Sequence, residues 1–211
     1  MSVSPAGPES IKTALVARAH TLGFAECRVA AALPAAHREV LEAWVAEGKY
    51  GDMAWMARNV ERRGDPRLVL PGAQSVIVLA LGYHQGAETP ESLFKIARYA
   101  WNDDYHDLVG KKLRVLDSLL VAYGGSQRSY VDTGPVLERD FATESGLGWN
   151  GKSTMQLARS LGTWFFLAEI ITTLALPADP PARNLCGKCT RCIDACPTGA
   201  ITAPHHLDAR K

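Results

Sequence analysis

The sequence has no long apolar run and no excess charge of either sign. A membrane-spanning helix needs about 18 or more consecutive apolar residues, and no stretch of the 211 residues reaches that length. The N-terminal segment Met1 to Ser10 also lacks the basic residues and apolar run of a secretory signal. A formal net charge of +1 gives no overall basic field that would attract nucleic acid. We therefore expect a cytoplasmic protein without membrane contact, on which any RNA would bind at a local patch.

Cysteine is also scarce, and its distribution is uneven. Four of the five cysteines fall within the eleven residues from Cys186 to Cys196. In a reducing compartment, such a cluster favours a metal site over a disulfide framework. Cys27 stands alone in the apolar stretch Phe24 to Ala30, which predicts a buried, inert thiol.

Hydrophobic periodicity predicts helices and strands that mix without a fixed repeat. This irregular order favours an α+β fold in which helices flank a sheet, with the apolar run Ser75 to Leu81 as a central strand. The predicted helices are Ser10 to Leu22, Pro34 to Glu47, Tyr105 to Tyr123 and Leu137 to Ser145, and the other predicted strands are Phe24 to Ala30, Ser129 to Thr133 and Thr163 to Thr172.

The chain is expected to hold one large domain and one small module. The segment Leu176 to Asn184 contains three prolines, each of which fixes φ and removes a hydrogen-bond donor, so it is typical of a semi-rigid connector. We place the boundary here, with residues 1–176 as the main domain and residues 177–211 as the cysteine-containing module.

The cysteine run has a spacing that is typical of iron–sulfur proteins. Cys186, Cys189, Cys192 and Cys196 follow the pattern C-x2-C-x2-C-x3-C-P of bacterial ferredoxins. Structural zinc sites usually separate two ligand pairs by a longer loop, so zinc is the weaker alternative. In two-cluster proteins the fourth cysteine of such a run binds the other cluster. On that scheme the chain alone lacks one ligand for the first cluster and three for the second, as expected for a shortened protein.

A second pattern, Gly146 to Ser153, matches the phosphate-binding sequence G-x-x-x-x-G-K-[ST]. A phosphate-binding loop of this kind follows a buried strand, whereas the preceding segment Leu137 to Ser145 is charged and is predicted to be helical. Nucleotide hydrolysis is therefore disfavoured. Two other interpretations are a tight turn, because glycine reaches positive φ without steric cost, and a loop that closely approaches a large cofactor.

Several segments together resemble epoxyqueuosine reductases, and the resemblance spans nearly the whole chain. The core of the match is the V-D-T-G-P sequence that begins at Val131. The segments that carry the resemblance are Gly51 to Asn59, Asp65 to Arg67, Leu70 to Gly72, Ala97 to Ala100, Asp104 to His106, Val131 to Arg139, Gly146 to Lys152, Cys196 to Ile201 and Leu207 to Arg210.

The resemblance implies a tRNA-modifying enzyme that reduces epoxyqueuosine to queuosine in the anticodon loop. It implies base-off cobalamin in an α+β domain related to that of reductive dehalogenases. It also implies that a partial ferredoxin-like module follows this domain. In the family, the complete module carries two [4Fe-4S] clusters. It also implies a low-potential electron donor of the flavodoxin or ferredoxin type, and we expect a monomer. One alternative is a ferredoxin-like electron-transfer protein, and another is a corrinoid reductive dehalogenase, although those enzymes usually carry a twin-arginine signal that is missing here.

The resemblance also implies roles for individual residues. Asp132 is the proposed proton donor to the epoxide oxygen, a role that needs a protonated carboxyl and hence a pKa raised by burial against the corrin. Without the resemblance, Asp132 would be interpreted as the residue that caps the turn at Thr133 to Pro135. The candidate cofactor-binding residues, besides Asp132, are Arg58, Tyr99, Ser153 and Thr154. The sequence departs from the family at Ser153, where the family usually has asparagine.

Overall fold

A four-stranded antiparallel sheet forms the centre of the molecule in the computed structural model, which describes residues 7–84, 86 and 96–211. Its strands, in spatial order, are β1 (Glu26–Ala31), β2 (Ser75–Gly82), β6 (Phe165–Thr172) and β3 (Gln127–Tyr130). Residues 75–80 of β2 are all buried. Because β2 pairs on both sides and is covered on both faces, the prediction of a central strand is confirmed.

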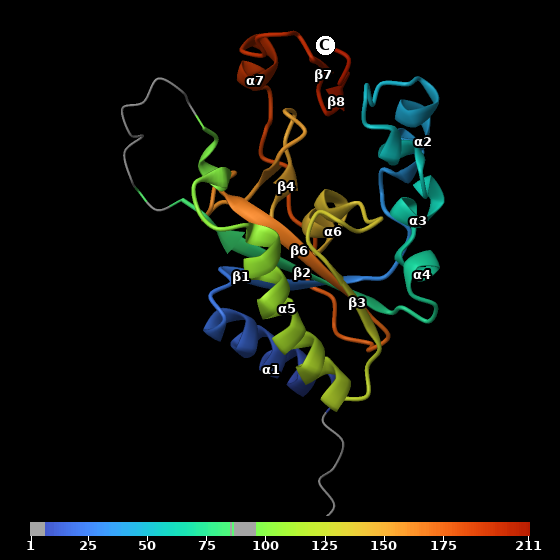
Figure 1. Cartoon of the computed structure of the whole chain (residues 1–211), viewed down its shortest axis with the longest axis vertical. Helices are drawn as coiled ribbons and strands as arrows, with labels where there is room; N and C mark the ends of the chain where they lie inside the picture. The colour runs from blue at the N-terminus through green and yellow to red at the C-terminus, as the bar shows by residue number, and fades with distance from the viewer. Residues whose placement is uncertain (1–6, 85, 87–95) are drawn as a thin grey trace, which may run out of the picture.

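Helices cover both faces of this sheet (Figure 1). Side chains alternate along a strand, so Ile77 and Leu79 of β2 pack on the face covered by α1 (Pro8–Thr21) and α5 (Tyr105–Ala122). Val76 and Val78 pack on the opposite face with Phe141 of α6 (Glu138–Glu144). Each fully buried side chain of this size stabilises the fold by about 1.5–3 kcal/mol. The α+β class with a helix-flanked sheet is as the sequence predicts.

The remaining elements are short. They lie beyond the carboxyl end of β1, around the pocket and at the C-terminus: α2 (Arg38–Ala46), η1 (Ala54–Ala57), α3 (Val60–Gly64), α4 (Pro66–Val69), η2 (Arg98–Ala100), β4 (Trp149–Asn150), β5 (Gln156–Leu157), α7 (Arg191–Asp194), β7 (Ile201–Ala203) and β8 (His206–Leu207). The C-terminal segment contacts the α2 region, because Trp44 Nε1 donates to the Leu207 carbonyl at 2.6 Å and Ala209 N donates to the Lys49 carbonyl at 2.8 Å. In the described residues, no helix is long and apolar enough to cross a membrane.

Two of the predicted elements differ most from the structure in their boundaries. The predicted helix Pro34 to Glu47 begins only at Arg38, since residues 34–37 form irregular chain and a turn. The predicted strand Ser129 to Thr133 is instead Gln127–Tyr130, because the chain leaves the sheet after Tyr130 and Asp132 takes a positive φ of 55°. The latter change has a functional consequence, since it turns the Asp132 side chain towards a pocket.

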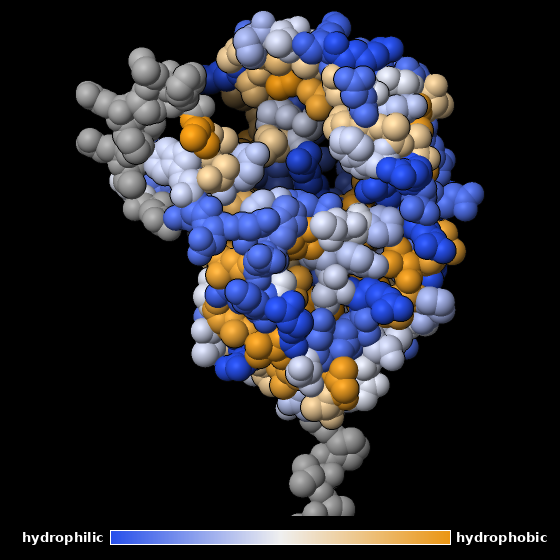
Figure 2. All heavy atoms as spheres, viewed as in Figure 1, coloured by the Kyte–Doolittle hydropathy of each residue, from blue (hydrophilic) through white to orange (hydrophobic). Residues whose placement is uncertain are grey.

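The proline-containing segment between the main domain and the cysteine run lies against the main domain. Asp179 accepts a hydrogen bond from Lys12 Nζ at 2.8 Å and another from the Val29 backbone at 2.8 Å. Further along, Ala182 N donates to the Thr143 carbonyl at 3.0 Å. These contacts fix the direction in which the chain enters the cysteine run. The space-filling view shows a hollow between the C-terminal segment and the rest of the molecule, with hydrophilic atoms in its depth (Figure 2).

Candidate functional site

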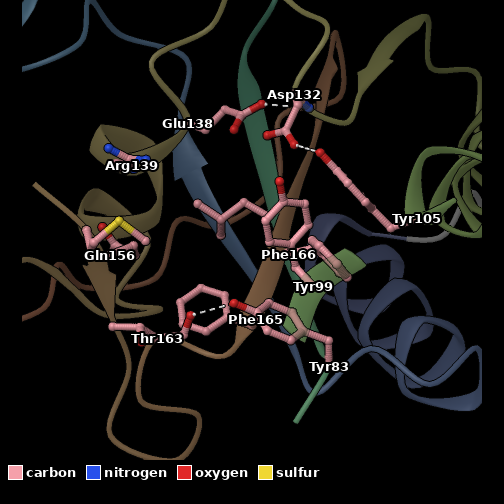
Figure 3. A pocket seen from close by; sticks show the side chains of 12 residues that line it. Tyr83, Tyr99, Tyr105, Asp132, Glu138, Arg139, Gln156, Thr163, Phe165 and Phe166 are labelled. Atoms are coloured by element: carbon pink, nitrogen blue, oxygen red, sulfur yellow. Dashed lines mark hydrogen bonds between the residues drawn. The ribbon is translucent and has the colours of Figure 1, made fainter. Parts of the chain in front are cut away.

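An open pocket of about 310 Å³ lies where β2, β6, α5 and the loop after β3 meet. Its walls are mainly aromatic and acidic, and Figure 3 shows Asp132, Glu138 and Tyr105 at one end, with Tyr83 and Thr163 at the other. The rim exposes large apolar side chains, since Tyr99 and Met155 are 51% and 44% exposed. An apolar rim around a polar interior suits a ligand that is flat and apolar on one side and presents a polar reacting group on the other.

Tyr105 and Asp132 form the first functional contact of the pocket. The Tyr105 hydroxyl donates a short hydrogen bond to Asp132 Oδ2. Its ring stacks on Phe166 of β6, with 4.1 Å between centroids and 5° between planes, so the sheet fixes the position of the hydroxyl. Burial first, and then the bond to Asp132, raise the pKa of Tyr105. Tyr105 is therefore a protonated donor at neutral pH, and it orients the Asp132 carboxyl.

The backbone of Asp132 also points to a specialised role. A φ of 55° is uncommon for a residue with a side chain, although aspartate and asparagine tolerate it better than most. The conformation is supported on both sides, because Asp132 N donates to Glu138 Oε1 at 3.2 Å while Tyr105 holds the carboxyl. In the described residues, the Asp132 carboxyl thus receives a hydrogen bond from helix α5 and none from the turn Thr133 to Pro135. The side chain is exposed to the pocket, so the protein itself does not supply the burial that the sequence-based hypothesis required.

Behind Asp132 lies a pair of carboxyl groups that the sequence analysis did not identify. Glu169 stands in the middle of β6, on the α6 face, and is completely buried. Neither of its oxygens makes a hydrogen bond of normal geometry. Burial, followed by the charge of Glu138, raises the pKa of Glu169 well above that of an ordinary glutamate.

Glu138 is the partner of Glu169 and begins helix α6. Burial, and then the charge of Asp132, raise the pKa of Glu138 to about 7. The charge of Glu138 is in turn the second cause, after burial, that raises the pKa of Glu169. Two carboxyls in this environment cannot both be ionised at low cost.

The buried carboxyl predicts a pH dependence of stability. An unfolded glutamate loses its proton near pH ~4.3, whereas folding raises the pKa of Glu169. Between these two values the folded chain holds the extra proton, so the free energy of unfolding falls by about 1.4 kcal/mol per pH unit as pH rises. Glu169→Gln should therefore flatten the decline and be more stable than the wild type at pH ~8. Urea unfolding followed by circular dichroism across this range measures the effect.

The matched control for stability is Glu144→Gln, because Glu144 is an exposed carboxylate on helix α6. Its unfolding free energy should follow the wild-type pH dependence. Parallel curves for wild type and Glu169→Gln would contradict a buried, protonated Glu169.

The phosphate-binding pattern at Gly146 to Ser153 does not form a phosphate-binding loop. It joins helix α6 to the β4–β5 hairpin, so neither a preceding strand nor a following helix is present in this part of the structure. The glycines serve close packing instead. A Cβ on Gly148 would lie 2.0 Å from the Leu157 carbonyl, and one on Gly146, whose φ is +77°, would lie 2.3 Å from the Pro180 carbonyl. The rejection of nucleotide hydrolysis is consistent with this geometry.

The predicted cofactor residues fall at different places. Tyr99 and Asp132 both line the pocket. Thr154 lies next to it, because its carbonyl accepts a hydrogen bond of 2.6 Å from the lining residue Arg139. Ser153 is half-buried in the same hairpin turn, and Arg58 is an exposed residue at the end of η1; neither is among the residues that line the pocket.

Lys152 connects the main domain to the cysteine run. Its Nζ donates to the carbonyls of Gly187 and Cys189, at 2.7 and 2.9 Å. The four cysteines of this run are free thiols that are half-buried or exposed: Cys186, Cys189, Cys192 and Cys196. The pKa of Cys196 is lowered, and the main cause is a hydrogen bond from the Ile201 backbone. Accessible thiols with backbone N–H donors fit an iron–sulfur cluster, which binds thiolate. Among the described residues, no three His, Cys, Asp or Glu side chains are grouped closely enough to hold a single metal ion.

Cys27 behaves as predicted. It is 4% exposed on β1, and burial is the main cause that raises the pKa of its thiol to about 12. A thiol in this state is neither a nucleophile nor a metal ligand at neutral pH.

Fold and site together define a class of protein, namely an α+β domain with an acidic, aromatic pocket that is followed by an iron–sulfur-binding segment. Comparison with known proteins agrees with both parts. The family model described as epoxyqueuosine reductase QueG, DUF1730, matches residues 63–133, and the model of the 4Fe-4S double cluster binding domain matches residues 185–211.

Individual relatives narrow the class to one family. The chain is 41% identical to an epoxyqueuosine reductase of Synechococcus sp. (strain RCC307), across 97% of this chain and 65% of that protein. A solved epoxyqueuosine reductase, in complex with an epoxyqueuosine-modified tRNA stem loop, matches with a TM-score of 0.84 and 29% identity, covering 95% of this chain and 55% of the other. Over the part that it shares with these proteins, the chain is similar to epoxyqueuosine reductases. It spans about two thirds or less of their length.

A more distant likeness concerns the fold alone. A catabolic reductive dehalogenase matches with a TM-score of 0.58 at 17% identity, covering 98% of this chain and 25% of that one. The two chains thus share their fold over the length of this chain.

Proposed function

We propose that this chain carries the catalytic domain of an epoxyqueuosine reductase, which reduces the epoxide of epoxyqueuosine in a tRNA anticodon loop. In this proposal residues 1–176 form the cobalamin-binding domain, and residues 177–211 form part of a ferredoxin-like module. The observation that carries it is Asp132, which the chain holds at positive φ on the pocket wall with its carboxyl bound by Tyr105.

The pocket fits the cofactor and the substrate that the family implies. The exposed apolar rim at Tyr99, Met155 and Trp164 offers a broad surface that a corrin would cover. Cobalamin, when bound, would supply the reducing chemistry at the epoxide carbon, with electrons that arrive through the iron–sulfur clusters. Tyr99, Asp132 and the turn at Ser153 and Thr154 are the proposed contacts with the cofactor, with Arg58 as a more peripheral one.

The chain's own residues would manage the proton and the solvent. Asp132 is positioned to give a proton to the oxygen of the opening epoxide, and Tyr105 keeps that carboxyl directed into the pocket. The aromatic walls at Phe165, Phe166 and Tyr83 would exclude water from the reacting atoms. Over the whole reaction two electrons and two protons enter, and the epoxide oxygen leaves as water.

Cobalamin binding tests this proposal directly. The purified chain, incubated with cobalamin and then desalted, should retain about one cobalamin per chain, seen as corrinoid absorbance. With reduced clusters and an epoxyqueuosine-containing stem loop, mass spectrometry of the nucleosides should show the loss of one oxygen atom. A chain that retains clusters but binds no corrinoid would be an electron-transfer protein instead.

A further inference from the structure

Asp132 holds only one proton at a time, whereas the proposed reduction consumes two. The pocket therefore needs a second proton source close to Asp132. Glu138 lines the same pocket and accepts a 3.2 Å hydrogen bond from Asp132 N. Glu169 lies behind Glu138 and is fully buried, with both oxygens unpartnered within the described part of the chain.

We propose that Glu138 and Glu169 share one proton at neutral pH and resupply it to Asp132 during each turnover. This inference rests on the proposed function. After Asp132 has given its proton to the epoxide oxygen, the pair transfers its proton to the Asp132 carboxylate through the pocket. Asp132 then gives this second proton to the departing oxygen, which leaves as water, and the pair regains a proton from solvent after product release.

The positions of Glu138 and Glu169 suit both the storage of a proton and its delivery to Asp132. Glu169 is opposite Val78 on β2 and Tyr130 on β3, so apolar and aromatic neighbours, not solvent, surround its carboxyl. Among the described residues, the charge of Asp132 raises the pKa of Glu138 and the charge of Arg139 lowers it. Arg63 also interacts electrostatically with Glu138. Glu169, which is buried, therefore retains the proton, and Glu138, which lines the pocket, exchanges it.

A carboxylate buried for structural reasons alone would be expected to have a cationic partner or several hydrogen bonds. Glu169 has neither in the described residues: Arg63 has a lowered pKa, caused by burial, and donates at 3.5 Å to the Gly134 carbonyl instead. No partner therefore offsets the free-energy cost of burying the Glu169 carboxyl. This uncompensated group lies near Asp132, the residue that the proposed reaction uses.

The experiment compares the pH profile of turnover for wild type, Glu169→Gln, Glu138→Gln and the exposed control Glu144→Gln. Glutamine keeps the shape of the side chain but cannot store an acidic proton. Glu169→Gln should lower turnover by about ten- to a hundredfold. It should also move the alkaline limb of the profile to lower pH, because Glu169, whose pKa burial raises well above its ordinary value, no longer retains the shared proton. A purely structural role would lower turnover without moving this limb.

A second measurement does not depend on turnover. Infrared spectra of the chain with isotope-labelled glutamate carboxyls, recorded about one pH unit above the pKa of Glu138, should show a protonated glutamic acid in wild type and in Glu144→Gln that is lost in Glu169→Gln. Absence of this band in the wild type, or an unchanged alkaline limb in an active Glu169→Gln, would overturn the relay alone. No turnover by the cobalamin-loaded, reduced wild type would overturn the proposed function and the relay with it.

Discussion

Asp132→Asn is expected to lower the turnover of epoxyqueuosine by at least about a hundredfold, since general acid catalysis contributes 10² to 10⁴ in rate. Asparagine is the most conservative replacement available, because it also tolerates the positive φ that Asp132 adopts. Its amide oxygen can still accept the Tyr105 hydroxyl bond, so the loop and the pocket should keep their shape. Only the transferable proton is lost. The comparison of product formation by mass spectrometry measures the loss.

Two further measurements separate this interpretation from damage to the fold. The Asp132→Asn chain should retain cobalamin after desalting in the same amount as the wild type. The control variant is Asp107→Asn, which removes one negative charge from an exposed position in the first turn of α5, near Tyr105. It should leave turnover within about twofold of the wild-type value. Near wild-type turnover in Asp132→Asn, with cobalamin bound, would remove Asp132 from the role of proton donor.

The sheet could be predicted from the sequence because its strands carry strong local signals. From Val76 to Leu81 strand β2 is apolar throughout, which occurs where both faces of a strand are covered, and the structure places it between β1 and β6. The hairpin of β4 and β5 has only two residues in each strand. Such elements are too short to show a hydrophobic period, so their position follows from packing against the rest of the chain.

The candidate site was predictable only in part. Tyr105 was predicted as the first residue of a helix, but its role depends on a contact with Asp132, 27 residues further along the chain. Local sequence patterns do not encode such contacts. For Glu169 a signal was present, because a single acidic residue interrupts the otherwise apolar strand Phe165–Thr172. A charged residue at a position that the pattern predicts to be buried marks a candidate functional group.

Cys189→Ala is expected to abolish the iron that the chain retains through its cysteine run. In the ferredoxin pattern, Cys186, Cys189 and Cys192 bind successive corners of one cluster, and two thiolates do not hold a cubane. Cys189 is exposed, so its removal should leave the core and the pocket intact. Iron analysis and the visible absorbance of the reconstituted chain measure the loss. Turnover should fall to background, since electrons would no longer reach the pocket, while cobalamin stays bound.

Cys27→Ala is the matched control, because it removes a thiol of the same chain that is buried and whose raised pKa, about 12, keeps it protonated. It should retain all of the iron at a cost of about 1 kcal/mol in stability. Retention of iron by Cys189→Ala would contradict the ferredoxin-like ligand scheme. Stoichiometric zinc without visible absorbance in the wild type would instead favour the tetrahedral zinc site that the spacing of the cysteines disfavours. The two variants thus separate ligation by this run from a general effect of removing a thiol.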